Sequence, residues 1–135
     1  NGILCDGQCR TNVPGVFACG DVARWENPLF GERMRIEHWT NAVEQANTVA
    51  AALLDDGAPA LSSVPYFWTD QYDAKIQFAG RIAPGDAVRI EEGCMAGRDL
   101  VALYGREGKL RGVLTVNKPA ALVRYRRAIA SGANF

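Results

Sequence analysis

Residues 11–23 read TNVPGVFACGDVA, and this stretch decides the predicted fold. The apolar run 16–19 lies between Pro14-Gly15 and Gly20-Asp21, and a short apolar run between turn residues is typical of a strand covered on both faces. In open α/β sheets, ligands bind beyond the carboxyl ends of the strands. Gly20 would let a ligand approach the backbone there, and Asp21 would offer an acceptor to a ligand hydroxyl. The alternative is a buried strand followed by a plain Gly-Asp turn.

Around this stretch the pattern predicts one hairpin and one helix. Residues 3–5 can pair as a strand across the turn Asp6-Gly7, and residues 25–35 have no periodicity and are predicted as a loop. A helix is predicted from Asn41 to Asp55, with a capping arrangement of Asn41 and Glu44 and a stop at Gly57. Its apolar face is predicted to comprise Ala42, Ala46, Val49, Ala50 and Leu53.

The second half of the chain predicts an antiparallel meander. Apolar runs at 76–79, 87–90, 100–104 and 110–116 are separated by turn residues, and residues 106–109 form a short turn between the last two. A closing helix is predicted after Pro119, with Leu122, Arg126 and Ile129 on one side and an end near Gly132. The fold class is therefore α+β, with two domains expected at residues 1–60 and 61–135.

Composition narrows the function classes. Fifteen basic and fifteen acidic residues cancel, so no global charge draws the chain to nucleic acid or to an anionic membrane. No apolar run approaches the ~20 residues that a bilayer-crossing helix needs, and a cytoplasmic location is the default expectation. The chain starts at Asn1 rather than Met, so a processed protein or a fragment is expected.

The four cysteines do not form a recognisable motif. Three residues separate Cys5 from Cys9, a spacing that matches neither a CxxC redox pair nor a paired-CxxC zinc site, and His38 is the only histidine. We therefore expect no metal site. Small, buried or incidental roles are expected for Cys5, Cys9, Cys19 and Cys94. A disulfide between the first two is left open but not predicted.

Four segments, in the same order, resemble ferredoxin-reductase-type flavoproteins. Residues 11–23 resemble the second FAD motif of reductases with two dinucleotide-binding domains. Residues 35–46 look like the segment in which a helix N-terminus points at the flavin ring. Residues 65–72, PYFWTDQY, resemble the opening of the C-terminal domain, in which a tryptophan borders the flavin. Residues 115–119 resemble the Val-Asn-x-Pro junction near the end of that domain.

The resemblance implies a set of FAD-binding residues. Carried over position by position, the set is Gly20, Asp21, Glu37, His38, Trp39 and Trp68. None of them is a clear acid, base or nucleophile, so no catalytic residue is expected. For His38, an ordinary hydrogen-bonded or exposed histidine remains an equal alternative. The first domain would be the closing part of a split, Rossmann-like FAD-binding domain, and the second the small C-terminal domain of antiparallel sheet plus helix.

The resemblance also implies an activity for a longer protein. NAD(P)H would reduce FAD, and FAD would reduce a [2Fe–2S] ferredoxin or a rubredoxin. No G-x-G-x-x-G fingerprint occurs in the chain, so the residues that bind NAD(P)H and most of FAD would lie upstream, and the fragment alone would be inactive. Arg124, Arg126 and Arg127 could attract an acidic ferredoxin, although a solvated helix face is the simpler interpretation. The rival function is a non-catalytic docking or homodimerisation module, as in apoptosis-inducing-factor-like or nitrite-reductase-associated flavoproteins.

Overall fold

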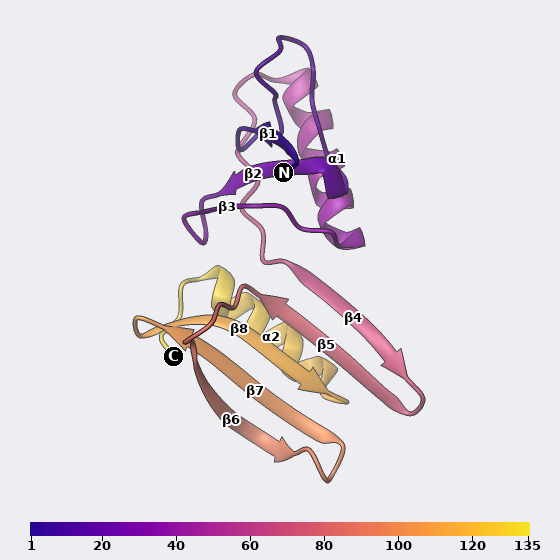
Figure 1. Ribbon diagram of the computed structural model, residues 1–135, viewed down its shortest axis with the longest axis vertical. Coiled ribbons are helices and arrows are strands. Elements are labelled where there is room, and N and C mark those ends of the chain that lie inside the picture. Colours follow the sequence, from indigo (N-terminus) through magenta and orange to yellow (C-terminus); the bar gives the residue numbers. More distant parts are fainter. The chain divides into compact units, whose positions relative to one another are not determined.

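The computed structural model describes residues 1–135 and divides the chain into two compact units, Asn1–Pro65 and Tyr66–Phe135 (Figure 1). Each unit combines one helix with one β-sheet. The expected α+β class is confirmed by this element content. Neither helix has the length and apolar character that crossing a membrane would require.

Unit 1 contains a three-stranded sheet of order β1-β2-β3. Strand β1 (Ile3–Cys5) pairs in parallel with β2 (Ala23–Asn27), and β2 pairs antiparallel with β3 (Glu32–Met34). Alternate residues of β2 are buried, and Trp25 is the largest fully buried side chain. A 3-10 turn, η1 (Gly20–Val22), leads into β2, and helix α1 (Trp39–Leu54) follows β3.

The predicted strand at residues 16–19, covered on both faces, is wrong, because no regular strand forms there and Val16 and Cys19 are exposed. Its backbone bonds go to the preceding segment, because Thr11 N–H donates to the Val16 carbonyl and Ala18 N–H donates to the Cys9 carbonyl, both over 3.0 Å. A single antiparallel bridge joins Arg10 to Phe17. The turn at Pro14-Gly15 therefore closes a minimal ribbon, and Gly20 follows it without a regular strand.

Two further predictions in unit 1 are wrong. Residues 3–5 form a strand, but it pairs in parallel with β2 instead of folding back across Asp6-Gly7. The segment 25–35, predicted as a loop, carries the β2–β3 hairpin, in which Trp25 faces Met34. The polar residues of this hairpin masked its alternation: Asn27 is completely buried, and its side-chain amide donates to the Ser63 carbonyl over 2.8 Å.

Helix α1 is present, but its buried face is polar. It starts at Trp39, two residues before the predicted start, and its buried residues are Asn41, Gln45 and Ala52. Asn41 is not the cap, because His38 precedes the first helical residue and the Asn41 amide donates to the Ile36 carbonyl over 3.1 Å. The predicted apolar face is wrong as a buried face, since Ala46, Ala50 and Leu53 are exposed.

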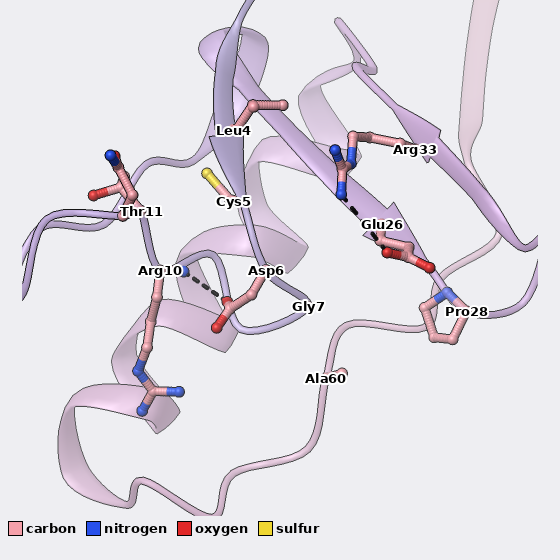
Figure 2. Close-up of a pocket in the computed structure, with 11 residues that line it drawn as sticks. Leu4, Cys5, Asp6, Gly7, Arg10, Thr11, Glu26, Pro28, Arg33 and Ala60 are labelled. Atoms are coloured by element: carbon pink, nitrogen blue, oxygen red, sulfur yellow. Dashed lines mark hydrogen bonds and ion pairs between the residues drawn. The ribbon is translucent and has the colours of Figure 1, made fainter.

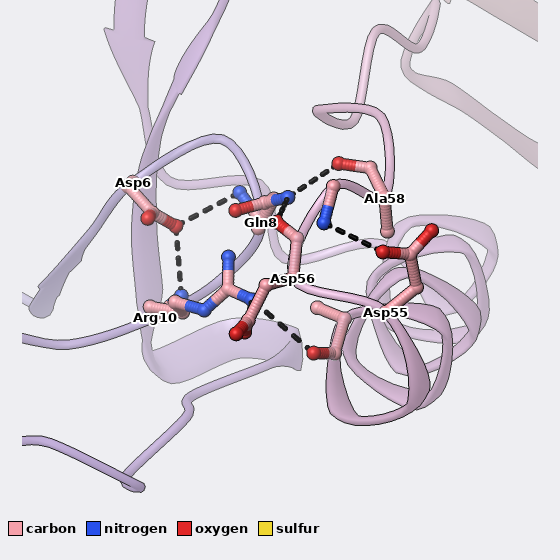
Figure 3. Close-up of polar contacts among 8 residues, drawn as sticks. Asp6, Gln8, Arg10, Asp55, Asp56 and Ala58 are labelled. Carbon is pink, nitrogen blue, oxygen red and sulfur yellow. Dashed lines mark hydrogen bonds and ion pairs between the residues drawn. The ribbon is translucent and has the colours of Figure 1, made fainter.

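The C-terminal end of α1 is tied to the loop after β1 by polar contacts (Figure 3). The Arg10 guanidinium donates to the Ala52 carbonyl over 3.2 Å and pairs with Asp56 over 3.0 Å. The Gln8 amide donates to the carbonyls of Asp56 and Ala58. A cation and donors at a helix C-terminus satisfy its unpaired carbonyls and its negative dipole end. The contacts therefore hold the loop that leads into the Gly20 turn against α1.

Unit 2 is a five-stranded antiparallel sheet of order β4-β5-β8-β7-β6 with one helix (Figure 1). The elements are β4 (Tyr66–Gln71), β5 (Ala74–Gly80), β6 (Ala87–Cys94), β7 (Asp99–Arg106), β8 (Lys109–Val116) and α2 (Pro119–Ala130). The four predicted strands and the closing helix are confirmed. Strand β4 was not predicted as a strand, and β5 pairs with β8, so only β6, β7 and β8 form a consecutive meander.

Buried residues of unit 2 lie on both faces of its sheet: Leu100, Ala102 and Val116 form a hydrophobic cluster on one face, and α2 covers the other. Tyr66, Ala79, Val113 and Leu103 are register partners across four strands and therefore share one face of the sheet. The Arg126 guanidinium of α2 lies over the Tyr66 ring, which identifies this face as the one that α2 covers. Ala79, Val113 and Leu103 are at most 2% exposed. Strand β4 is an edge strand, with β5 as its only neighbour.

Candidate functional site

The turn at Gly20-Asp21 is anchored to helix α1. Gly20 has a φ of +75°, a left-handed conformation that glycine adopts without steric cost. Its N–H donates over 2.7 Å to the side-chain carbonyl of Gln45, which is completely buried. Asp21 follows with an exposed side chain. The bond to Gln45 therefore fixes the backbone of the turn while leaving the carboxylate accessible.

Arg35 connects this turn to the approach of α1. Its Nη1 donates over 3.0 Å to the backbone carbonyl of Asp21 and pairs over 2.6 Å with the Glu37 carboxylate. Asp21 and Glu37 lie on separate segments, η1 and the extended stretch before α1. One guanidinium thus holds the two segments in a defined geometry.

The N-terminus of α1 is free of acidic residues and of a side-chain cap. The first N–H groups of a helix have no partner within the helix and give it a partial positive charge. Trp39, its first residue, is 78% exposed. Burial lowers the pKa of His38, whereas the negative charge of Asp21 opposes that shift. His38 is therefore expected to be neutral near pH 7.

These features suit the group that the resemblance implies. The backbone at Gly20 is open, because a Cβ there would meet only the Ala42 side chain at an ordinary 3.5 Å. Asp21 can accept a hydrogen bond from a sugar hydroxyl, and the helix start can favour negative charge on a ring system. The residues of unit 1 therefore fit the contact set expected for a flavin nucleotide.

Trp68 lies in unit 2, on β4, and is 42% exposed. Its ring is stacked on that of Tyr66, with centroids 5.5 Å apart and planes inclined by 21°. Of the six predicted residues, unit 1 thus carries five. Three of these five residues make contacts that hold them near α1. Gly20 is bonded to Gln45 of the helix, and Arg35 contacts both Asp21 and Glu37.

Sequence reasoning missed Arg35 and Gln45 as residues that shape the site. Both lie within the segment 35–46 that carries the resemblance, but neither has a pattern that identifies its contact partner. No sequence signal marked Gln45, because the apolar periodicity of the helix indicated a different face and its burial is visible only in the structure. Its significance appears only when the Gly20 N–H is placed beside it.

The three arginines of α2 do not form a free basic patch. Arg124 pairs with Glu92 over 2.8 Å and lies over the Tyr125 ring. Arg126 lies over the Tyr66 ring, with its guanidinium carbon 5.4 Å from the centroid. Arg127 is exposed. The simpler interpretation of this segment, an ordinary helix face, agrees better with these contacts.

A pocket of about 580 Å³ opens on unit 1, and Gly20 is not among the residues that line it (Figure 2). It lies beside Leu4 and Cys5, and its rim carries Arg33, which pairs with Glu26 over 3.9 Å. None of the six predicted site residues lines it. No group of three or more His, Cys, Asp or Glu side chains in the chain is arranged to hold a metal ion. All four cysteines are free thiols, with Cys5 and Cys9 buried.

Comparison with protein families divides the chain near the boundary between the units. Residues 66–135 match the family described as Reductase C-terminal. Residues 1–46 match the family described as pyridine nucleotide-disulphide oxidoreductase. The first match covers all of unit 2, including Trp68, and the second covers the Gly20 turn and the start of α1.

Individual relatives are similar along nearly the whole chain. The ferredoxin–NAD(+) reductase component of the anthranilate 1,2-dioxygenase system of Burkholderia cepacia is 36% identical over 98% of the chain. The ferredoxin reductase for the CYP199A2 system of Rhodopseudomonas palustris is 40% identical over 99% of the chain, with a TM-score of 0.90. Putidaredoxin reductase, in its covalent complex with putidaredoxin, is 30% identical over 97%, with a TM-score of 0.88. The chain spans about a third of the length of each: 32%, 33% and 31%.

Proposed function

The chain belongs to the Reductase C-terminal family, and from this premise we propose that it is part of an FAD-dependent NAD(P)H:ferredoxin reductase. Relatives that match almost the whole chain are ferredoxin–NAD(+) reductase components. Because the chain spans about a third of their length, the activity is assigned to the intact reductase. The domains proposed for it are the closing segment of the FAD-binding domain, residues 1–60, and the C-terminal domain, residues 61–135.

One observation carries this proposal: the Gly20-Asp21 turn is bound to α1 by Gln45 beside an uncapped helix start. FAD, when bound, would accept a hydride from NAD(P)H and release electrons singly to a one-electron carrier. Asp21 would accept a hydrogen bond from a cofactor hydroxyl. The start of α1, with Glu37, His38 and Trp39, would face the flavin and favour negative charge on it.

Trp68 is proposed to border the flavin and to exclude water from its edge. Trp68 is 42% exposed, so it has surface available for a further aromatic contact. No residue of the chain is proposed as an acid, base or nucleophile. We propose a ferredoxin as the electron acceptor, because a solved complex joins a similar reductase to putidaredoxin.

The test is FAD retention by the intact reductase after Asp21→Ala. Losing one hydrogen bond of this kind costs about 0.5–3 kcal/mol, which weakens binding by about two- to a hundredfold. Flavin absorbance per protein should therefore fall after extensive dialysis, while the far-UV circular dichroism spectrum stays unchanged. Asp70→Ala, which removes an exposed carboxylate paired with Lys75 in unit 2, is the matched control.

Wild-type flavin occupancy in the Asp21→Ala protein would remove Asp21 from the site. The rival function, a docking or dimerisation module, predicts no NADH- or NADPH-dependent reduction of ferredoxin by the intact protein. Steady-state assays with both nucleotides and a ferredoxin therefore separate the two functions.

A further inference from the structure

The orientation of the Trp68 ring cannot come from β4 alone. Trp68 lies on an edge strand, so no strand flanks it on the outer side, and the residue is 42% exposed. Side chains alternate along a strand, which places Tyr66 and Trp68 on the same face of the sheet. Their rings stack at 5.5 Å with an inclination of 21°. The position of the Tyr66 ring therefore determines the surface against which Trp68 rests.

Tyr66 is itself held from two other elements. The amide of Gln77, on β5, donates to the Tyr66 hydroxyl over 2.8 Å. Gln77 is 7% exposed and is the register partner of Trp68, so it lies directly beside the stacked pair. The Arg126 guanidinium of α2 lies over the Tyr66 ring, with 5.4 Å between the guanidinium carbon and the ring centroid. A cation over an aromatic face is attracted by the ring quadrupole.

We propose that Arg126 and Gln77 are positioning residues for Trp68 and that both act through Tyr66. Arg126 would hold the Tyr66 ring against the sheet, and the hydrogen bond from Gln77 to the Tyr66 hydroxyl would fix the rotation of that ring. The Trp68 ring, which stacks on the Tyr66 ring, would then be held in a plane close to it. The consequence for electron transfer rests on the proposed function, in which Trp68 borders the flavin. Arg126 thereby has a role inside unit 2 and not in attracting a charged partner.

The positioning is tested on the 135-residue chain labelled with 5-fluorotryptophan. The chain has three tryptophans, so its ¹⁹F spectrum should show three resonances, and Trp68→Phe assigns one of them. Arg126→Ala should shift and broaden the Trp68 resonance and leave those of Trp25 and Trp39 in place. Arg126→Lys, which keeps a cation, should restore most of the wild-type shift. The matched control is Arg127→Ala, an exposed neighbour on the same helix, which should change none of the three.

Two substitutions at Tyr66 separate its contacts. Tyr66→Phe keeps the stacked ring but removes the hydroxyl that Gln77 binds, so it should broaden the Trp68 resonance while displacing it little. Tyr66→Leu removes the stack and should move that resonance further than any other variant. Wild-type position and width of the Trp68 resonance in Arg126→Ala would overturn the role of Arg126. The same result in Tyr66→Leu would overturn the whole proposal.

Kinetics of the intact, flavin-loaded reductase distinguish failure of the inference from failure of the proposed function. Arg126→Ala should lower the rate of ferredoxin reduction by about two- to tenfold, because small misplacements of a contacting group are costly. The dependence of that rate on salt should stay at its wild-type slope. A changed slope would assign Arg126 to partner attraction and contradict the inference. If Arg126→Ala moves the Trp68 resonance but Trp68→Ala reduces ferredoxin at the wild-type rate, the positioning stands and the proposed role of Trp68 at the flavin fails.

Discussion

A methyl group at Gly105 should reveal how tightly the end of the chain is packed against the sheet. Gly105 is buried on β7, and a Cβ there would overlap the Phe135 ring. That ring lies 4.9 Å from the Arg89 guanidinium, and the Phe135 N–H donates to the Gly108 carbonyl over 3.0 Å. Gly105→Ala must therefore displace an anchored ring.

The magnitudes follow from packing. Overpacking costs about 1–3 kcal/mol, and replacing a strand glycine by alanine returns roughly 0.5–1 kcal/mol, so Gly105→Ala should lower the free energy of unfolding by about 1 kcal/mol. Phe135→Ala should cost about 1–2 kcal/mol through lost burial and the lost cation–π contact. In the double variant the new methyl enters the space that the ring vacated. The double variant should therefore be about 1–2 kcal/mol more stable than the sum of the single changes implies.

Urea unfolding followed by circular dichroism measures this coupling, provided that the slope with urea stays constant across the variants. Gly112→Ala is the matched control, because its methyl would meet Ile82 and Phe78 but not Phe135. Combined with Phe135→Ala, it should be additive within about 0.5 kcal/mol. If the stability losses of Gly105→Ala and Phe135→Ala also add within about 0.5 kcal/mol, the Phe135 ring does not pack on Gly105.

Three further outcomes are expected. At pH 8 the exposed thiols of Cys19 and Cys94 should react quickly with a thiol reagent, whereas the buried thiols of Cys5 and Cys9 should react only after unfolding. Burial also raises the pKa of Cys9 to about 12, which keeps it protonated at pH 8. Fast labelling of Cys9, found by peptide mapping, would contradict its burial. Hydrogen bonds from the Arg106 side chain hold the pKa of Asp86 below its usual 3.8. The stability that this carboxylate contributes is therefore fully present above pH 3.8, and it is lost as the pH falls through the lower pKa that Asp86 has in the folded chain. Asp86→Asn should therefore lower the free energy of unfolding by about 1–3 kcal/mol at pH 7. Between pH 4 and pH 2, urea unfolding should show that the variant loses less stability than wild type. Equal losses in the two proteins would refute the role of Asp86. Gln8→Ala should speed amide hydrogen exchange at the end of α1 by about fivefold, from the loss of about 1 kcal/mol of hydrogen bonding; unchanged exchange at residues 54–58 would show that the contacts of Gln8 do not hold this end.

The fold of unit 2 could be predicted from sequence because its signals are local. Its strands alternate with turn residues, and Glu107 and Gly108 adopt the positive φ values of +53° and +72° that a tight hairpin turn requires. The proline at the start of α2 is likewise a local signal. Strand β4 escaped prediction because its aromatic and polar residues have no clear alternation and it lies at the sheet edge.

Unit 1 could be predicted only in part, because distant polar contacts determine it. The motif at Gly20-Asp21 located the turn, whereas the start of α1 was predicted two residues too late. The pairing of β1 with β2 joins residues about 20 positions apart, which no local pattern encodes. The apolar periodicity of α1 indicated the wrong buried face, since the buried positions carry the amides of Asn41 and Gln45. Their partners, Ile36 and Gly20, are visible only in three dimensions.

Because the buried face of α1 carries Asn41 and Gln45, the stability of the unit and the position of the Gly20 turn can change independently. Apolar contacts are non-directional, so they define the position of a helix along its axis less sharply than a hydrogen bond does. A helix held through Gln45 to a single N–H of the Gly20 turn has a preferred setting, because a shift by one residue breaks that bond. A leucine or methionine at position 45 could keep or even raise the melting temperature and still release the turn. Selection for thermal stability alone would therefore not detect the loss of this bond. The proposed flavin retention by the intact reductase has to be measured separately.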